Sequence, residues 1–240
     1  MSNRTVLVTG ANKSIGFETA RQLGLAGFSI WLGSRDQTRG DAAAKSLKAM
    51  GVDARAIVID VTAEASIRNA AARVETEDGR LDILINNAGI PGAMVAPSEQ
   101  SVDDIGEIYD TNVLGPIRVT QAFLPLLRKA DSATVVMVSS GLGSLGWLSD
   151  PENQFYGVNF LGYNSSKTAL NAVTVAFAKE LRAIGISVNA ADPGYTATDF
   201  NGHTGYRTVE QAAEGIVWLA TEGLAGLTGG FYFDGKEVPW

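Results

Sequence analysis

The sequence predicts an α/β fold: a doubly wound Rossmann-type domain with a parallel seven-stranded sheet and helices on both faces. Short, β-branched apolar segments alternate along the chain with longer helix-like segments, as expected for parallel strands that are buried on both faces. A glycine-rich turn joins the first apolar segment to the first helical one, as in nucleotide-binding βα units. Because no linker, repeat or change of composition divides the chain, we expect a single dinucleotide-binding and catalytic domain over residues 1–240.

The individual elements follow from these patterns. Apolar runs rich in β-branched residues predict strands at residues 5–8, 29–32, 55–59, 83–85, 134–138, 187–189 and 230–233. Helical periodicity predicts helices at 16–25, 42–50, 65–75, 101–127, 163–184 and 209–219. Right-handed crossovers between successive strands then build a parallel sheet with helices on both sides.

The composition argues against several classes of protein. There is no cysteine and a single histidine, His203, which argues against thiol nucleophiles, serine hydrolases with a catalytic histidine, and metal sites. A net charge of −7 argues against nucleic acid as a partner. No apolar stretch is long enough to span a membrane. The residues before the first strand lack the apolar region of a signal peptide, so we expect no leader. We therefore expect a cytoplasmic protein without a metal, nucleic-acid or membrane partner.

The turn after the first predicted strand has the composition of a phosphate-binding loop. Glycine lets the backbone approach a pyrophosphate, and the helix that follows offers free N–H groups and a positive dipole. Such a turn could also join a strand to a helix without binding anything. Its place after the first strand of a βα alternation favours a dinucleotide site, formed by Gly10, Asn12, Lys13, Ser14, Ile15 and Gly16.

The end of the second predicted strand indicates which dinucleotide binds. An acidic residue near this position commonly accepts hydrogen bonds from the adenosine ribose. Here the strand ends in Ser34 and Arg35, with Lys13 in the glycine loop, and two cations would suit a 2′-phosphate. Asp36 follows and could compete, and Arg35 could simply be a solvated surface charge. We expect NADP(H) as the cofactor.

Polar residues also follow the third and fourth predicted strands. Asp60 and Val61 come after the third strand, where a carboxylate can accept a hydrogen bond from the adenine amino group, and Asn87, Ala88 and Gly89 follow the fourth. The carboxyl ends of parallel strands are where open α/β sheets bind ligands. Taken singly, each of these segments could also be a turn or a helix cap.

Tyr163 and Lys167 form the candidate catalytic pair. They are four residues apart in a helix-like stretch, so they share one helix face. An ammonium near a phenol stabilises the phenolate and lowers its pKa, which lets the tyrosine exchange a proton with an alcohol or carbonyl oxygen. The pattern alone is more often a surface pair on an amphipathic helix. Ser139 and Ser140, at the end of the fifth strand, favour a site because they place hydroxyls at the same sheet edge.

Taken together, these motifs resemble those of the classical short-chain dehydrogenase/reductase family over nearly the whole chain. The matching pieces are Thr9-Gly10 with Gly16, Asp60-Val61, Asn86-Asn87-Ala88-Gly89, Asn112, Ser140, Tyr163 with Lys167, and Pro193-Gly194. The resemblance implies a hydride transfer between a nicotinamide and a carbonyl or alcohol carbon.

The resemblance also implies roles for individual residues. Tyr163 would be the general acid in reduction and the general base in oxidation, and Ser140, rather than Ser139, would orient the substrate oxygen. Lys167 would bind the nicotinamide ribose and lower the tyrosine pKa, and Asn112 would hold a water that completes a proton relay. The segment after the sixth strand would contact the cofactor through Pro193, Gly194, Thr196 and Thr198.

Three features depart from the family pattern. Ser14 replaces the middle glycine of the loop and can fit if its φ stays negative. Asp192 precedes Pro193 without an assigned role. The interval between Ser140 and Tyr163 is longer than in typical members. We expect an insertion at about 147–160 and a lid at about 195–207 to lie over the active site, with His203 as a solvated lid residue. Apolar side chains there would wall the substrate pocket, or alternatively form an interface: Met94, Leu142, Trp147, Phe155, Tyr156, Tyr195 and Phe200.

The sequence thus predicts an NADPH-dependent carbonyl reductase of apolar ketones and aldehydes, reversible with secondary alcohols. Two other functions stay open: a non-catalytic NADP(H)-binding sensor, and an NAD-dependent alcohol dehydrogenase that works mainly in oxidation. Alanine-rich helices at 101–127 and 163–184, by resemblance to the family, favour a homodimer or homotetramer.

Overall fold

Eight strands form one sheet in the computed structural model, which describes residues 4–240; residues 1–3 of the predicted domain lie outside the described residues. The strands lie in the order β3-β2-β1-β4-β5-β6-β7-β8. Their bounds are β1 (Thr5–Val8), β2 (Ser29–Ser34), β3 (Ala54–Val58), β4 (Ile83–Asn86), β5 (Ala133–Val138), β6 (Ile186–Ala191), β7 (Phe231–Phe233) and β8 (Lys236–Glu237). The first seven strands pair in parallel, as predicted.

The prediction of seven strands is wrong by one. The short strand β8 pairs antiparallel to β7, after a tight turn at Asp234 and Gly235, which both have positive φ values. A charged segment of two residues carries no apolar pattern, so nothing in the sequence marked it as a strand.

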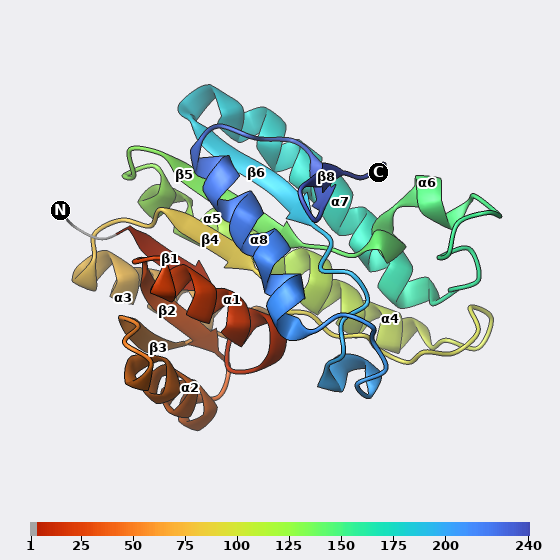
Figure 1. Ribbon diagram of the computed structural model, residues 1–240, viewed down its shortest axis with the longest axis horizontal. Coiled ribbons are helices and arrows are strands. Elements are labelled where there is room, and N and C mark those ends of the chain that lie inside the picture. Colours follow the sequence, from red (N-terminus) through yellow and green to blue (C-terminus); the bar gives the residue numbers. More distant parts are fainter. Residues whose placement is uncertain (1–3) are drawn as a thin grey trace.

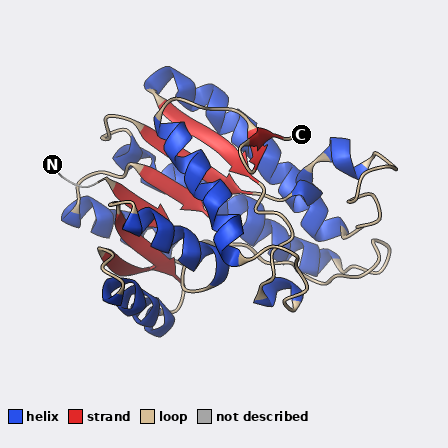
Figure 2. Cartoon of the chain, viewed as in Figure 1, coloured by secondary structure: helices blue, strands red, loops and turns tan. Residues whose placement is uncertain are grey.

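Helices cover both faces of the sheet (Figures 1 and 2). Their bounds are α1 (Ser14–Leu25), α2 (Gln37–Ala49), α3 (Glu64–Glu77), α4 (Val102–Tyr109), α5 (Gly115–Leu127), α6 (Leu145–Leu148), α7 (Leu161–Leu181) and α8 (Val209–Leu224). The helices α3, α5 and α7 share one buried apolar cluster with the sheet, whereas α1, α2 and α8 share the other. Neighbouring positions of one strand point into opposite clusters, so Leu7 belongs to the first and Val8 to the second. This explains the unbroken apolar runs of the sequence.

The predicted helix 101–127 is interrupted. A π-helical turn, Asp110–Leu114, separates α4 from α5. Pro116 lies at the start of α5 and has no N–H to donate to the carbonyl of Asn112 four residues earlier, which disfavours a regular α-helical turn there. Asn112 therefore lies on the irregular turn, and π-turns are frequent at functional sites.

Among the described residues, none of the helices combines the length and apolar character that a membrane crossing requires.

Candidate active site

The glycine loop between β1 and α1 packs against the end of β4 with almost no free space. Gly10 has a φ of +62°, and a Cβ placed on it would lie 3.0 Å from the Cα of Ala88. A Cβ on Gly16 would lie 2.4 Å from Nδ2 of Asn87 and 2.7 Å from the carbonyl oxygen of Gly10. The loop therefore needs glycine at both positions, as the sequence pattern indicated.

Hydrogen bonds fix this loop to the segment after β4. Nδ2 of Asn87 donates to the carbonyl oxygens of Thr9 at 2.9 Å and Gly10 at 3.2 Å. Oγ1 of Thr9 accepts the N–H groups of Asn87 and Ala88. Asn87 and Ala88 thus hold the shape of the loop, a positioning role that Thr9 shares and that the sequence analysis did not give it.

The prediction of a negative φ at Ser14 is wrong, because this residue has a φ of +55°. A non-glycine residue in the left-handed region costs roughly 1–2 kcal/mol. Lys13 precedes the first turn of α1 and makes no side-chain cap hydrogen bond, and no acidic side chain lies in that turn. The free N–H groups and the positive dipole at the N-terminal end of α1 can therefore face an anion. Asn12 and Ile15 lie half-buried beside it, so the loop fits the pyrophosphate of a dinucleotide.

The charges at the end of β2 favour a phosphate over a free ribose hydroxyl. Arg35 is exposed. Asp36 is engaged as the N-cap of α2, where Oδ1 accepts the N–H of Arg39 at 2.8 Å. Ser34 is buried and hydrogen-bonds the backbone of Asp36. Lys13 does not stand free, because its Nζ forms a 2.6 Å ion pair with Asp199 of the predicted lid.

Asp60 and Val61 follow β3 at the same edge of the sheet. Oδ1 of Asp60 accepts hydrogen bonds from the backbone and side chain of Thr62. These bonds, and more weakly the positive charge of Arg35, hold the pKa of Asp60 below its ordinary value. Asp60 is thus a carboxylate at neutral pH, the form that can accept a hydrogen bond from an adenine.

Ser140, Tyr163 and Lys167 converge at the carboxyl end of β5. Tyr163 and Lys167 lie one turn apart on α7, with Nζ of Lys167 5.7 Å from the centre of the Tyr163 ring. The Ser140 side chain lies near enough to the Tyr163 phenol to lower its pKa. Ser139 instead is buried and hydrogen-bonds Asn171 at 2.6 Å. The geometry thus favours Ser140 over Ser139 as the residue of the site.

Burial dominates the ionisation of this pair. It raises the pKa of Tyr163 above its ordinary value, while Ser140 lowers that pKa and the negative charge of Asp192 raises it. The lowering expected from Lys167 is not among the influences on this pKa, which lies above its ordinary value. Burial lowers the pKa of Lys167 to about 8, against the opposing effect of Asp192. Nζ of Lys167 donates to the carbonyl oxygen of Val138 at 2.8 Å.

Asn112 connects the π-turn to the segment after β4. Its Oδ1 accepts the N–H of Ile90 at 2.8 Å, and its Nδ2 donates to the Ile90 carbonyl and to Oγ of Ser166. A Cβ on Gly89 would lie 3.3 Å from this Oδ1 and 3.7 Å from Nζ of Lys167. Asn112 and Gly89 therefore adjoin the lysine, although the predicted water relay through Asn112 stays a prediction.

The loop after β6 completes the edge. Gly194 follows Pro193 with a φ of +71°. Thr196 is buried, and its hydroxyl donates to the carbonyls of Pro193 and Gly194. Thr198 caps the short helical turn Asp199–Asn201. The structure thus brings the predicted nicotinamide side of the site together with the serine and tyrosine.

Comparison with known proteins assigns the family. Residues 4–207 match the family model for short chain dehydrogenase. The chain belongs to the short-chain dehydrogenase family. The predicted family and enzyme class, an oxidoreductase of alcohol and carbonyl groups, are thereby confirmed.

Individual relatives of this short-chain dehydrogenase cover nearly the whole chain. A short-chain dehydrogenase, anuI, of Penicillium roqueforti (strain FM164) is 38% identical and covers 91% of this chain and 88% of its own. A (+)-neomenthol dehydrogenase of Arabidopsis thaliana is 33% identical and covers 98% of this chain and 97% of its own length. The crystal structure of NADPH-bound carbonyl reductase from chicken fatty liver superposes with a TM-score of 0.87 at 30% identity, covering all of both chains. The NADPH in that structure agrees with the predicted cofactor.

The predicted insertion packs against the segment that follows Ser140. It contains α6, and the rings of Trp147 and Phe155 pack 5.4 Å apart. A Cβ on Gly141 would meet the Phe155 ring at 2.7 Å. The insertion is also fixed to the last residue of the chain, because the N–H of Gly146 donates to the carbonyl of Trp240, whose indole stacks on Phe231 at 5.7 Å.

The other residues of the predicted pocket differ in their contacts and in their exposure. Phe200, in the predicted lid, packs edge-on against Tyr163 at 5.4 Å. Tyr195 instead turns to Tyr206 and hydrogen-bonds Thr204. Met94, Tyr156 and Tyr195 are exposed and Leu142 is half-buried, so their pocket role stays a prediction. His203 is exposed and contacts Asp199, as expected of a solvated lid residue.

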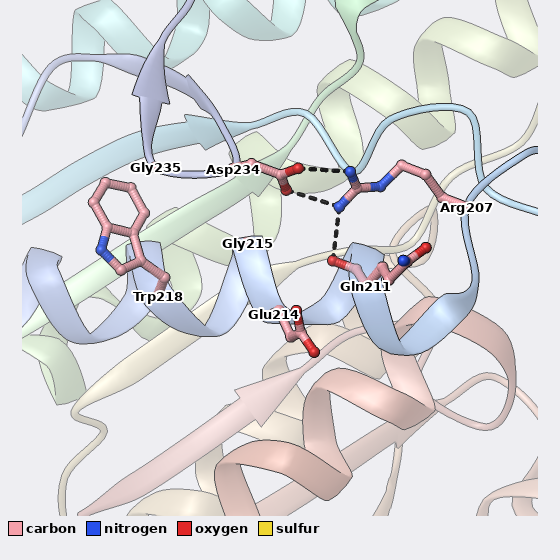
Figure 3. Close-up of a pocket in the computed structure, with 7 residues that line it drawn as sticks. All are labelled: Arg207, Gln211, Glu214, Gly215, Trp218, Asp234 and Gly235. Atoms are coloured by element: carbon pink, nitrogen blue, oxygen red, sulfur yellow. Dashed lines mark hydrogen bonds and ion pairs between the residues drawn. The ribbon is translucent and has the colours of Figure 1, made fainter.

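A pocket of about 390 Å³ lies outside these residues, between α8 and the turn after β7 (Figure 3). On one side of it, the guanidinium of Arg207 forms two bonds of 2.6 and 2.7 Å with Asp234 and donates to the carbonyl of Gln211. Arg207 also packs against Gly194, since a Cβ there would lie 2.6 Å from its Cδ. Arg207, held by Asp234, thus packs against the loop after β6 and supports it. Neither role could be predicted from the sequence, because the partners are distant along the chain.

Proposed function

We propose that this dehydrogenase is an NADPH-dependent carbonyl reductase that acts on uncharged, fairly apolar ketones or aldehydes and works reversibly with secondary alcohols. One observation carries the proposal: the phenol of Tyr163, the hydroxyl of Ser140 and the ammonium of Lys167 meet at the sheet edge that also bears the glycine loop. A protein that only senses a dinucleotide has no need of these three groups together.

Each residue has a chemical task in this proposal. NADP(H), held by the glycine loop, Arg35 and the loop after β6, supplies the hydride carrier. Tyr163 gives a proton to the carbonyl oxygen in reduction and takes it back in oxidation. Ser140 donates a hydrogen bond to the same oxygen and orients it. Lys167, whose ammonium predominates below a pKa of about 8, keeps positive charge near the phenol.

The aromatic side chains around Tyr163 support an apolar substrate. Phe200 lies against the tyrosine ring, and Phe155 lies against the backbone beside Ser140. Neither side chain carries charge, so a charged substrate would lose hydration without gaining a partner. The neomenthol dehydrogenase and carbonyl reductase relatives, by their names, act on alcohols and carbonyl compounds, in line with this substrate class.

The proposal is tested with a panel of aromatic and alkyl ketones, each assayed with NADPH and NADH. Wild type should oxidise NADPH with some members. Tyr163→Phe should lose at least about 100-fold in kcat and still bind NADPH, whereas Tyr232→Phe, which removes a hydroxyl on β7, should keep its activity. Tyr163→Phe with an unchanged kcat would remove Tyr163 from this role. A wild type that binds NADPH but reduces nothing would favour a sensor.

The cofactor preference is tested separately. Arg35→Asp should weaken NADPH binding and relatively favour NADH, because a carboxylate repels a 2′-phosphate. Arg68→Asp makes the same charge change at an exposed arginine of α3 and should leave the preference unchanged. Equal NADPH affinities of Arg35→Asp and wild type would refute the phosphate-binding role of Arg35.

We further propose that residues 1–240 act as one domain in a cytoplasmic homodimer or homotetramer. Exposed apolar side chains such as Val102 on α4 and Leu114 in the π-turn after it support self-association through this part of the surface. Light scattering of the purified protein tests this, and a monomer at micromolar concentration would contradict it.

A further inference from the structure

Asp192 is a buried carboxylate that the proposed mechanism does not use. It follows the last residue of β6 and is 5% exposed. An ionised carboxylate in the interior is costly unless hydrogen bonds or opposite charges compensate it. The need for a turn after β6 alone therefore does not explain why a carboxylate is buried at this position.

The carboxylate joins the two loops that flank the substrate oxygen. Its Oδ1 accepts the N–H of Gly194 at 2.9 Å, which belongs to the loop after Pro193. The carboxylate also lies beside Gly141, the residue after Ser140, whose backbone N–H lowers the pKa of Asp192. A Cβ on Gly141 would lie 2.9 Å from Oδ2 of Asp192, so only glycine lets the carboxylate come this close.

Four ionisable groups face Asp192 from the elements packed around it. Tyr163 and Lys167 lie on α7, Arg207 precedes α8, and Asp234 follows β7. The charge of Arg207 is largely neutralised by its paired bonds to Asp234 (Figure 3). Burial raises the pKa of Asp192 itself, whereas the N–H groups of Gly194 and Gly141 and the charge of Arg207 favour its ionised form. As a carboxylate, Asp192 acts on the tyrosine and the lysine alike.

We propose that Asp192 is a positioning residue of the active site, whose carboxylate fastens the loop of Ser140 to the loop of Gly194 and supplies the negative charge that keeps Lys167 protonated. This inference rests on the proposed reductase function. The negative charge favours the ammonium of Lys167 and disfavours the phenolate of Tyr163. It therefore sets the pH range in which an uncharged phenol and a charged amine coexist.

Asp192→Asn is the informative variant, because an amide oxygen can still accept N–H bonds but carries no charge. Loss of the charge lowers the pKa of both Tyr163 and Lys167, since the phenolate is no longer opposed and the ammonium no longer supported. Both limbs of the pH profile of kcat/KM for alcohol oxidation should move to lower pH, by about one unit. Asp192→Ala should additionally lower the plateau, because neither loop N–H keeps its acceptor.

Asp82→Asn is the matched control. Asp82 is another buried carboxylate, at the start of β4, where Oδ2 accepts the N–H of Thr5 at 2.7 Å. The same chemical change there should lower stability and leave both limbs in place. A merely structural Asp192 would behave like Asp82, with a lower melting temperature or plateau and unmoved limbs, and that result would overturn the proposal.

A measurement without turnover separates this proposal from the proposed function. Carbon NMR of the lysine ε-carbon follows the titration of Lys167, with its signal assigned by its loss in Lys167→Met. In Asp192→Asn the titration midpoint should fall below the wild-type midpoint, and an unchanged midpoint would overturn the role of Asp192. Absence of ketone reduction by wild type would refute the proposed function alone, because the NMR titration still decides the charge of Asp192.

Discussion

Replacing Gly16 by alanine tests whether the tight packing of the glycine loop is needed for cofactor binding. A Cβ there would lie 2.4 Å from Nδ2 of Asn87, 2.7 Å from the carbonyl oxygen of Gly10 and 3.1 Å from Cα of Ala11. The last two are backbone atoms and cannot rotate away, so the loop itself must shift.

The magnitude follows from two opposing effects. Alanine is favoured over glycine within a helix by up to about 1 kcal/mol, whereas overpacking costs about 1–3 kcal/mol. We expect Gly16→Ala to destabilise the protein by roughly 1–2 kcal/mol, which lowers the melting temperature by about 2–8 °C. A similar loss of binding free energy would weaken NADPH about tenfold.

Thermal unfolding and a fluorescence titration with NADPH measure both effects. The control is Gly106→Ala on α4, where an added Cβ meets nothing within 4 Å, so this variant should be as stable as wild type or more stable and bind NADPH normally. The reasoning would be refuted if Gly16→Ala matched Gly106→Ala in both measurements.

Three further predictions concern the same edge of the sheet. Ser14→Gly should raise the melting temperature by about 1–2 °C, because relief of the positive φ outweighs the added freedom of the unfolded chain; a lower melting temperature would contradict this. Asp199→Asn should tighten NADPH binding a few-fold in a direct titration, because Lys13 loses the carboxylate that competes with phosphate; unchanged affinity would exclude Lys13 from the phosphate site. Between pH 8 and 10.5 the unfolded chain holds the Lys167 proton and the folded protein releases it, so stability should rise with pH. Chemical denaturation should therefore show wild type gaining roughly 2–3 kcal/mol over Lys167→Met across this range, and parallel curves would contradict the lowered lysine pKa.

The architecture could be predicted because strands that are buried on both faces appear in the sequence as unbroken apolar runs. The first seven strands are apolar runs, whereas helix ends were predicted less well: α2 begins five residues before its predicted start, α8 ends five residues after its predicted end, and the short helix α6 was not predicted. The interruption at residues 110–114 could have been found from Pro116, whose missing N–H is visible in the sequence. The strand β8 could not, because two charged residues after a turn have no apolar periodicity.

The site was predictable where each residue acts through a neighbour in sequence or a motif, as with Tyr163 and Lys167. Contacts between residues of distant segments could not be predicted. The pairing of Lys13 with Asp199 joins residues 186 positions apart. The φ of Ser14 is dictated by the packing of the surrounding loop rather than by the serine. Burial raises the pKa of Tyr163, which no local pattern reveals.

The attachment of Trp240 to the insertion has a practical consequence for handling the enzyme. Its carbonyl accepts the N–H of Gly146 and its indole stacks on Phe231, so any polypeptide fused to Trp240 starts beside the helix that adjoins the substrate wall. A purification tag joined at that point would crowd this contact and could alter the measured Michaelis constants. Recombinant material for the assays above should carry its tag ahead of β1, on the side of the sheet where the strands begin (Figure 1).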